Sequence, residues 1–530
     1  MESEEPSSTH PTPIPSLRLN IIVLGLWISL FLAALDSTII STAVFDISNS
    51  FQSTSQSAWV VTAYLLTYNA FVLLLAKLSD IVGLKPLILI SNGIFLVFSI
   101  ACGVSQTMNQ LIVFRALQGI GASGLYCLVF VAILRLISLE KAGLYSGIIS
   151  SVFALSNLLG PILGGVIVDN TTWRWIFYLN IPLSAIAIVI LSIAIPASKD
   201  IKLNRETLSK LDFIGSLLSI CWLVPLLFAL QEGGSHYPWS SSKIIGSLTG
   251  GIVALITFVT YEAWLQKQNG TREPIFPIRF LRNPMQALLL LNVLFTGFAF
   301  YTSIILLPQR YQSVNAVSAS RAGVLLLTLT LCLPFFSLIA GAVLSKKPEM
   351  TYSLLILGTA LILTSTACLS DLSVNRAVSN TQYGFQVIMG AGLGLVSTTQ
   401  YVALKLTFPP SDTAAGTGAM NMLRAMGGCI GLALCATMLS AQLNSDLPSF
   451  LSPELVEIAK ETLREGNGLS ADNLTAVRQI YGKGYDSGFQ VMIAFAGANV
   501  IAAGLLFLVT SRRGGVDKLV EAAKAIEAQS

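Results

Sequence analysis

Fourteen long runs of apolar residues are the feature that most limits how this 530-residue chain can fold. A helix that crosses a bilayer needs about 20 mostly apolar residues, whereas a spanning β-barrel shows alternation over about ten residues. The runs here are unbroken, so the chain is predicted to be an all-α polytopic membrane protein. Its expected spanning helices are 20–44, 57–77, 86–105, 110–134, 143–168, 174–195, 212–231, 243–264, 286–309, 321–344, 351–370, 383–405, 417–440 and 488–510.

The scarcity of charge excludes a soluble domain. Only 11% of the residues are charged and 54% are hydrophobic, whereas soluble domains carry about 25% charged residues. The net charge of +4 is small and dispersed, and it gives no indication of a nucleic-acid partner. All 7 cysteines fall within apolar runs, so we expect neither a disulfide framework nor a metal site.

The distribution of Lys and Arg predicts the orientation, because cytosolic loops carry more of them. With the N-terminus in the cytosol, 20 of the 31 Lys and Arg residues fall on the cytosolic side and nine, including Arg310, fall outside. Two more, Arg115 and Arg424, fall within helices. We therefore expect both termini in the cytosol, with a disordered tail at 1–19 and a second tail at 511–530.

A weak internal repeat predicts two similar halves. FRALQGIGASG aligns with FQVIMGAGLGL, which places Gly119 on Gly390 and Arg115 on Gln386. Two halves in the same orientation are typical of parallel-repeat transporters. The expected parts are six-helix bundles at 20–195 and 286–510, an inserted helix pair at 212–264, and an outer loop at 441–487 within the second bundle.

The outer loop has two local signals. Ser452 followed by proline predicts the start of a short surface helix. Asn473-Leu474-Thr475 is a glycosylation sequon on the outer side. The sequon at Asn269 falls in a cytosolic loop and is expected to stay unmodified.

Three glycines imitate a nucleotide-binding motif. Gly119, Gly121 and Gly124 have the spacing G-x-G-x-x-G, and Glu140 follows 19 residues after Gly121, as an acidic ribose partner would. That motif needs a preceding strand and a surrounding βαβ unit, but here it lies within 24 mostly apolar residues, 111–134. Small residues in a spanning helix let a neighbouring helix approach closely. We therefore predict packing glycines and no enzyme activity.

Two charged residues are predicted to lie at a similar depth in the membrane. At 1.5 Å per residue, Asp36 is about 24 Å and Arg115 about 28 Å from the cytosolic end of its helix. A lone charge at the bilayer centre costs about 2.5–3.5 kcal/mol, so such residues usually face a cavity or each other. A carboxylate beside a fixed cation is a suitable proton-coupling site. The alternatives are a structural ion pair, or an Arg115 side chain that extends to the headgroups.

Three further positions have simple structural interpretations. Lys77 is expected at the cytosolic end of its helix from the orientation, and Asp80 beside it can be a solvated cap. Pro161, among glycines, predicts a kinked packing seam. Arg424 is expected near the cytosolic end of its helix, where it would extend to the headgroups or bond to a loop.

Together, the motifs resemble those of the fourteen-helix drug:proton antiporters of the major facilitator superfamily, in the fungal branch that exports toxins and secondary metabolites. The resemblance covers about residues 20–510. It rests, in chain order, on LDSTIISTAV with Asp36, LIVFRALQGIGASG with Arg115, LLGPILGG with Gly160, Pro161, Gly164 and Gly165, WRWIFYLNIP, LDFIG, DTAAGTGAMNMLRAMGGCIG and YGKGYDSGF. The resemblance implies the major facilitator fold: two six-helix bundles plus an inserted helix pair.

The loop after the second helix departs from the family pattern. The family has a glycine, an arginine and a basic residue where this chain has Ala76, Ile81 and Leu84. The retained residues of this gating loop are Lys77, Asp80, Gly83 and Lys85. In the family this loop steadies the outward-facing state, and the loss of the cation at position 81 weakens that expectation. Arg135, at the cytosolic end of the fourth helix, could replace it as the partner of Asp80.

By resemblance, the first, fourth, ninth and twelfth helices line a central cavity. Its expected lining residues are Gln118, Asn292, Phe295, Phe298, Tyr301, Gln386 and Gln400. Asp36 is the only carboxylate well inside any predicted helix. A cavity so poor in acid is expected to accept neutral or weakly charged amphipathic molecules better than dications.

The resemblance therefore implies a proton-driven exporter of drugs, toxins or secondary metabolites. We expect a monomer in the plasma membrane that needs protons and a small-molecule substrate but no cofactor. A vacuolar or plasma-membrane carrier for basic amino acids or siderophores is the alternative within transport. A non-transporting membrane sensor is less consistent with a tail of about 20 residues after the last helix.

Overall fold

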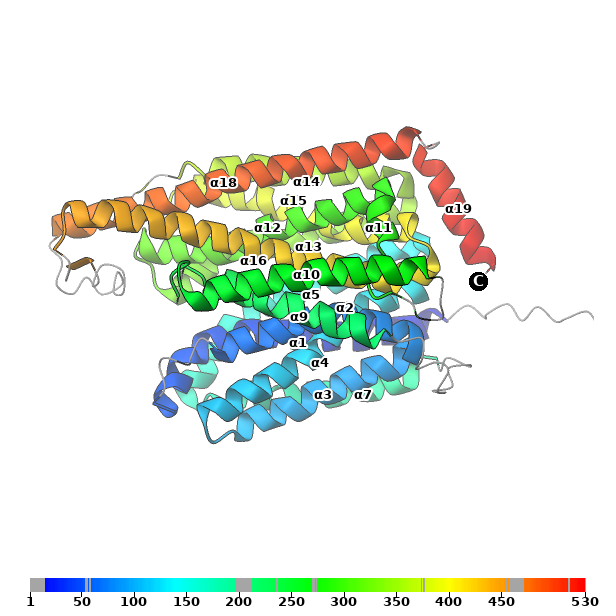
Figure 1. Cartoon of the computed structure of the whole chain (residues 1–530), viewed down its shortest axis with the longest axis horizontal. Helices are drawn as coiled ribbons and strands as arrows, with labels where there is room; N and C mark the ends of the chain where they lie inside the picture. Colours follow the sequence, from blue (N-terminus) through cyan, green and yellow to red (C-terminus); the bar gives the residue numbers. More distant parts are fainter. Residues whose placement is uncertain are drawn as a thin grey trace, which may run out of the picture.

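Long helices that run side by side form the protein in the computed structural model (Figure 1). The structure describes residues 15–529 except 53–55, 57–58, 197–211, 235–236, 269–271, 273, 373, 375–376, 453–454, 457–470 and 513–514. Within these residues, 14 helices are long and apolar enough to cross a membrane, as the sequence predicts. The expected tail at 1–19 lies mostly outside the described part, since α1 begins at Ser16.

The first half contains six spanning segments. They are α1 (Ser16–Ser50), α2 (Trp59–Val82), α3 (Leu84–Val104), α4 (Met108–Leu136), α5 (Leu139–Asn170), and a sixth formed by α6 (Arg174–Tyr178) with α7 (Asn180–Ala194). Thr107 caps α4, because its side chain accepts a hydrogen bond from the amide of Gln110 at 3.2 Å. This cap fixes the start of the helix that carries Arg115.

The second half also contains six spanning helices. They are α12 (Pro284–Ser313), α13 (Ala319–Lys346), α14 (Thr351–Leu369), α15 (Thr381–Thr407), α16 (Thr413–Asp446) and α18 (Ala471–Arg512). Between the halves lie α9 (Phe213–Glu232), α10 (Ser242–Lys267) and the short α11 (Arg279–Arg282). Short 3-10 turns occur at Pro348–Met350, Pro410–Asp412 and Leu447–Ser449, and α19 (Gly515–Gln529) follows the last spanning helix.

Several helices are longer than their apolar runs, and three of these extensions matter for the site. α12 continues to Ser313, α16 starts at Thr413 instead of 417, and α18 starts at Ala471 instead of 488. A helix satisfies its own backbone hydrogen bonds, so polar residues can extend it beyond the apolar stretch. Part of the expected outer loop at 441–487 is therefore helical. The short helix predicted after Ser452 falls mostly on 457–470, outside the described residues.

The packing glycines show that the two halves repeat the same arrangement. A Cβ atom on Gly119 would lie 2.5 Å from the Tyr64 carbonyl on α2, and one on Gly390 would lie 2.6 Å from the Leu329 carbonyl on α13. Gly121, two residues after Gly119, faces α3, the third helix of the first half. Gly392, two residues after Gly390, faces α14, the third helix of the second half. The register deduced from the sequence, Gly119 on Gly390, thus matches the packing.

The halves meet along two seams that are related by the repeat. The second helix of each half packs on the fifth of the other, α2 on α16 and α13 on α5. Of the inserted pair, α9 packs on α10 and also contacts α2 and α16, so the pair lies beside one seam (Figure 1). We call the end of the bundle where α1 begins and α18 ends the inner end, which is the predicted cytosolic side.

Several contacts close the space between the halves at the inner end. The Lys405 ammonium on α15 donates to the carbonyl of Ile137, which follows α4. A Cβ atom on Gly341 of α13 would lie only 2.4 Å from the carbonyl of Gly143 on α5, so these two backbones touch. The last helix adds an ion pair of 3.1 Å between Lys524 and Glu140.

Candidate functional site

Asp36 and Arg115 meet in an enclosed network within the first half. Nη1 of Arg115 donates to Oδ2 of Asp36, and Nε of Arg115 donates to the Val60 carbonyl at 3.1 Å. The side-chain amides of Gln118 and Asn180 each donate to Oδ1 of Asp36 at 3.1 Å. Asp36 is 1% exposed and Arg115 is 0% exposed. The pairing that was expected from their common depth is therefore present.

Aromatic rings complete the enclosure of Arg115. Its guanidinium carbon lies 4.2 Å from the ring centroid of Tyr64 and 5.8 Å from that of Phe177. The faces of such rings attract cations. The Tyr64 hydroxyl donates to the Ala33 carbonyl at 3.0 Å, which links α2 to α1. Arg115 thus points into the bundle, and its side chain does not extend to the headgroups.

The charge of Asp36 is matched by the side chains around it. The three side chains around the carboxylate, Arg115, Gln118 and Asn180, all offer N–H groups to it. Loss of the carboxylate charge would leave the Arg115 cation without a counter-charge. Removing one charge of a buried ion pair costs about 3–5 kcal/mol. The contact between α1 and α4 at this point therefore depends on the charges of Asp36 and Arg115.

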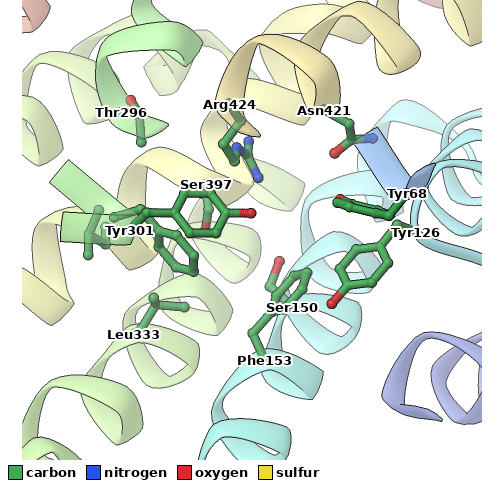
Figure 2. Close-up of a pocket in the computed structure, with 12 residues that line it drawn as sticks. Tyr68, Tyr126, Ser150, Phe153, Thr296, Tyr301, Leu333, Ser397, Asn421 and Arg424 are labelled. Carbon is green, nitrogen blue, oxygen red and sulfur yellow. The ribbon is translucent and has the colours of Figure 1, made fainter. Parts of the chain in front are cut away.

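A cavity lies between the two halves (Figure 2). Its described wall consists of Tyr68, Tyr126, Ser150, Phe153, Thr296, Phe300, Tyr301, Leu333, Leu393, Ser397, Asn421 and Arg424. These residues come from α2, α4 and α5 of the first half and from α12, α13, α15 and α16 of the second. Unlike the expectation by resemblance, α1 does not contribute to this wall. Aromatic walls with a few polar groups are typical of sites for small organic molecules.

The cavity is narrow in this conformation. The open space at the site amounts to about 620 Å³ when adjoining solvent is included, but only about 50 Å³ can hold the centre of a water molecule. Figure 2 shows the polar ends of Arg424, Tyr301 and Ser150 directed toward this common space. A drug-sized molecule would therefore have to separate the walls in order to bind.

Tyr301 is the one residue of the seven expected in the cavity that lies in its described wall. Gln118 instead holds Asp36. Gln386 is buried away from the cavity, where its amide donates to the Tyr311 hydroxyl at 2.7 Å. Gln386 therefore joins α15 to α12 within the second half and does not line the cavity.

Phe295 and Phe298 pack toward α18. The ring of Phe298 stacks on Phe495 with centroids 4.1 Å apart, and Phe295 lies 6.2 Å from the same ring. At about 100° per residue, Phe298 and Tyr301 point in directions about 60° apart, so one helix presents them to different neighbours. The sequence identified aromatic residues of this helix correctly but could not assign them to a face.

Asn292 and Gln400 form an amide network directly behind the wall. Asn292 donates to Oδ1 of Asn499 at 2.6 Å, and Gln400 donates to Oδ1 of Asn292 at 2.8 Å. Gln400 also donates to the hydroxyl of Thr296, a wall residue, at 3.0 Å. This network is fully buried, so both residues position the wall without facing the cavity.

Arg424 is a cavity residue that the sequence placed too near the membrane surface. Because α16 begins at Thr413, Arg424 lies about 16 Å along its helix, close to half of a hydrocarbon core of about 30 Å. Its Nη2 donates to Oε1 of Gln400 at 2.9 Å. The guanidinium carbon lies 5.5 Å from the Tyr401 ring centroid. Arg424 thus neither reaches the headgroups nor bonds to a loop.

The inner ends of α2 and α4 carry the ion pair that the sequence suggested. Asp80 accepts from Nη2 of Arg135 on α4, and Lys77 Nζ lies 3.6 Å from the other oxygen of Asp80. Arg135 thus supplies Asp80 with a cation in place of the one missing at Ile81. The structure joins α2 to α4 at the inner end through this carboxylate.

The two remaining residues of the gating loop shape the turn. Gly83 has a φ of 96°, a backbone conformation that residues with side chains rarely adopt. Lys85 extends from the start of α3, and its ammonium donates to the Ile195 carbonyl at 2.8 Å. Gly83 therefore permits the sharp turn, and Lys85 fixes α3 to the end of α7.

The glycines of α5 bring that helix onto α1. A Cβ atom on Gly160 would lie 2.2 Å from Oγ1 of Thr38, two residues after Asp36. Gly164 is also buried, whereas a Cβ atom on Gly165 would meet nothing within 4 Å. The side chain of Pro161 lies outside the described part. Gly160 is thus the motif residue most closely tied to the helix of Asp36.

Asp36 is not the only carboxylate inside the helices. Glu262 on α10 and Glu232 on α9 are 0% and 3% exposed. Asp486 on α18 lies 3.6 Å from Nη2 of Arg310, a buried residue that was expected outside the membrane. Apolar runs end at polar residues, so the sequence counted these groups as loops or helix ends. The described cavity wall nevertheless contains no carboxylate.

Asn473 lies in the first turns of α18, although a loop was expected there. Its side chain is partly exposed. Glycosylation at this residue remains a prediction.

Comparisons with known proteins agree on one family. The profile of the Major Facilitator Superfamily matches residues 26–432. The MFS-type transporter FPY5 of Fusarium mangiferae is 37% identical over 500 residues, which cover 92% of this chain and 83% of the relative. The efflux pump FUS6 of Gibberella fujikuroi is 30% identical, with coverage of 93% and 90%. Among solved structures, the proton:xylose symporter XylE superposes with a TM-score of 0.56 at 13% identity, covering 91% of this chain and 96% of XylE.

Proposed function

The chain belongs to the Major Facilitator Superfamily, and on that basis we propose that it exports amphipathic small molecules in exchange for protons. The observation that carries the proposal is the buried Asp36–Arg115 pair. It lies on α1 and α4, and α4 also supplies Tyr126 to the cavity wall. One helix thus connects the proton-binding candidate to the substrate-binding candidate.

In the proposed cycle, a proton on Asp36 removes the charge that holds Arg115. In the outward-facing state, Asp36 takes a proton from outside, the contacts with Arg115 loosen, and the substrate leaves. In the inward-facing state, Asp36 loses the proton to the cytosol and the cavity binds substrate again. Each charge that moves across 100 mV contributes about 2.3 kcal/mol, which can drive export against a gradient.

The contacts at the inner end support alternating access. Lys405, Lys524, and the Gly143–Gly341 contact all join the first half to the second at that end. These contacts must separate for the cavity to open to the cytosol. The Asp80–Arg135 pair joins α2 to α4 within the first half, so it can keep that half rigid while the halves move.

The composition of the cavity argues against a carrier of basic amino acids. Such a substrate carries a cation that needs a carboxylate partner in a dry site. The described wall offers Arg424 and no Asp or Glu. Export of amphipathic molecules fits this wall better.

A cellular efflux assay tests the proposal. Strains that lack or overexpress the protein are compared for compounds in the culture medium, with and without a protonophore. We expect overexpression to raise at least one exported compound, and the protonophore to abolish the increase. Asp36→Asn should remove the increase even where the protein reaches the membrane.

A second variant on the same helix controls for the substitution. Asp46 lies ten residues further along α1 and is partly exposed, so Asp46→Asn should preserve export. Full export by Asp36→Asn at equal protein level would contradict the assigned role of Asp36. Unchanged medium in every strain would contradict export itself.

A further inference from the structure

Arg424 brings an unpaired positive charge to the cavity. Within the described residues, no carboxylate lies within ion-pair distance of its guanidinium. The side-chain groups that it contacts are neutral: the amide oxygen of Gln400, at 2.9 Å, and Tyr401. Its Nε is buried and has no hydrogen-bond partner. The end of the guanidinium is directed into the cavity (Figure 2), where a ligand can reach it.

Among the described residues, the two fully buried arginines each have a carboxylate partner. Arg115 contacts Asp36, and Arg310 lies 3.6 Å from Asp486. A charge in a low-dielectric site is costly unless an opposite charge or strong hydrogen bonds compensate it. Arg424 differs from both in that it lines the cavity. The missing counter-charge can thus come from a ligand.

The groups around Arg424 suit the rest of such a ligand. Tyr301, Tyr68 and Tyr126 provide aromatic surface and hydroxyl groups, and Phe153 adds an apolar ring (Figure 2). Aromatic rings favour offset or edge contacts with other flat rings. Charge-assisted hydrogen bonds from arginine to an acid group are about twice as strong as neutral ones.

We propose that the cavity selects amphipathic organic anions, whose acid group binds Arg424 while a flat apolar body lies among the tyrosines. This inference rests on the proposed export function and specifies its substrate class. It narrows the expectation from the sequence, which was that neutral or weakly charged molecules are accepted better than dications. Arg424 is then the residue that determines specificity, and Gln400 holds it in position.

The preferred charge has a consequence for the driving force. When an anion leaves the cell and a proton enters, both movements carry positive charge inward. An inside-negative membrane potential should therefore accelerate transport of an anion more than transport of a neutral analogue.

Binding to the purified full-length protein gives the first test. The probes are 2-naphthalenesulfonate and its neutral analogue 2-naphthalenesulfonamide, measured by titration calorimetry. We expect the sulfonate to bind about 10-fold to 100-fold more tightly, the ratio that corresponds to one hydrogen bond to a charged group. Arg424→Gln should remove the difference, and Arg424→Lys should keep part of it. Arg321→Gln, at an exposed arginine, should keep all of it.

The sulfonamide controls for folding of the variants, because its affinity should be unchanged in Arg424→Gln. Sulfonate binding no tighter than sulfonamide binding in the unmodified protein, or no binding of either probe, overturns the inference. Loss of affinity for both probes in Arg424→Gln, with Arg424→Lys behaving alike, overturns the specific role of Arg424.

Transport in proteoliposomes separates this inference from the proposed function. A pH gradient that drives the sulfonate but drives the sulfonamide much less supports both. Equal transport of the two probes retains the exporter and rejects the anion preference. Tight, Arg424-dependent sulfonate binding without gradient-driven transport supports the anion site and counts against proton-coupled export.

Discussion

The Asp36–Arg115 pair predicts an unusual pattern of stability in three variants. Asp36→Asn keeps an acceptor for the amides of Gln118 and Asn180 but removes the charge opposite Arg115. The guanidinium then retains only the Val60 carbonyl, the amide oxygen of Gln118 and the aromatic rings. Breaking one side of a buried pair costs about 3–5 kcal/mol, so this variant should unfold much more readily.

Arg115→Gln leaves the opposite defect. Asp36 keeps two amide donors but loses its cation, and the cost should again be about 3–5 kcal/mol. The double variant Asp36→Asn/Arg115→Gln buries no net charge. Replacing a buried ion pair with neutral groups is often close to neutral, so the double variant should be more stable than either single variant.

The assay is the unfolding midpoint of purified protein in one detergent, compared across the four proteins under identical conditions. Independent substitutions add within about 0.3–0.5 kcal/mol. A double variant that is destabilised by the sum of the two singles would refute the coupling that the structure implies. Single variants indistinguishable from the unmodified protein would refute the burial argument itself.

Three further predictions follow from single contacts. Gly121→Ala should lower the unfolding midpoint, because the added methyl group would lie 2.6 Å from the amide nitrogen of Phe95 and overpacking typically costs about 1–3 kcal/mol. Gly246→Ala is the matched control, because a methyl group there would have nothing within 4 Å. Equal effects of the two substitutions would contradict the packing role of Gly121. Asp80→Arg and Arg135→Asp should each reduce export, and the two together should recover it, since the reversed pair again joins α2 to α4. An equally inactive double variant would show that export does not depend on this contact. Glycosidase treatment of membrane protein should increase its gel mobility, and Asn473→Gln should abolish that shift; a persistent shift would place the glycan at another sequon.

The sequence was sufficient for those features that depend on one helix or on periodic repetition. Fourteen spanning helices follow from apolar length alone. The match of Gly119 with Gly390 follows from the repeat, and each glycine packs on the second helix of its own half. The pairing of Asp36 with Arg115 was accessible because two charges at one depth in lipid tend to find each other.

Features that depend on the exact end or face of a helix could not be predicted in the same way. Arg424 and Arg310 were misplaced because polar residues extend α16 and α12 past their apolar runs. Phe295 and Phe298 were assigned to the cavity although they pack on Phe495. In a helix that is buried on several sides, apolar periodicity does not show which side faces the cavity.

Two of the three tyrosines in the described cavity wall gave no separate signal in the sequence. Tyr68 and Tyr126 lie in apolar stretches, where an aromatic residue is usually part of the core. Their rings are 4.7 Å apart, and they come from α2 and α4, so only the folded structure brings them to Arg424. Such convergence of distant segments is not encoded in the spacing of any one motif.

The central claim, that export is coupled to protons at Asp36, is tested most directly by measuring proton movement during transport. Proteoliposomes that contain a trapped pH-sensitive dye receive the transported substrate on one side, with no imposed gradient. We predict a substrate-dependent pH change in the unmodified protein and in Asp46→Asn, and no pH change in Asp36→Asn/Arg115→Gln despite intact folding and substrate binding. Substrate movement without any pH change in the unmodified protein, or an undiminished pH change in the double variant, would contradict the account.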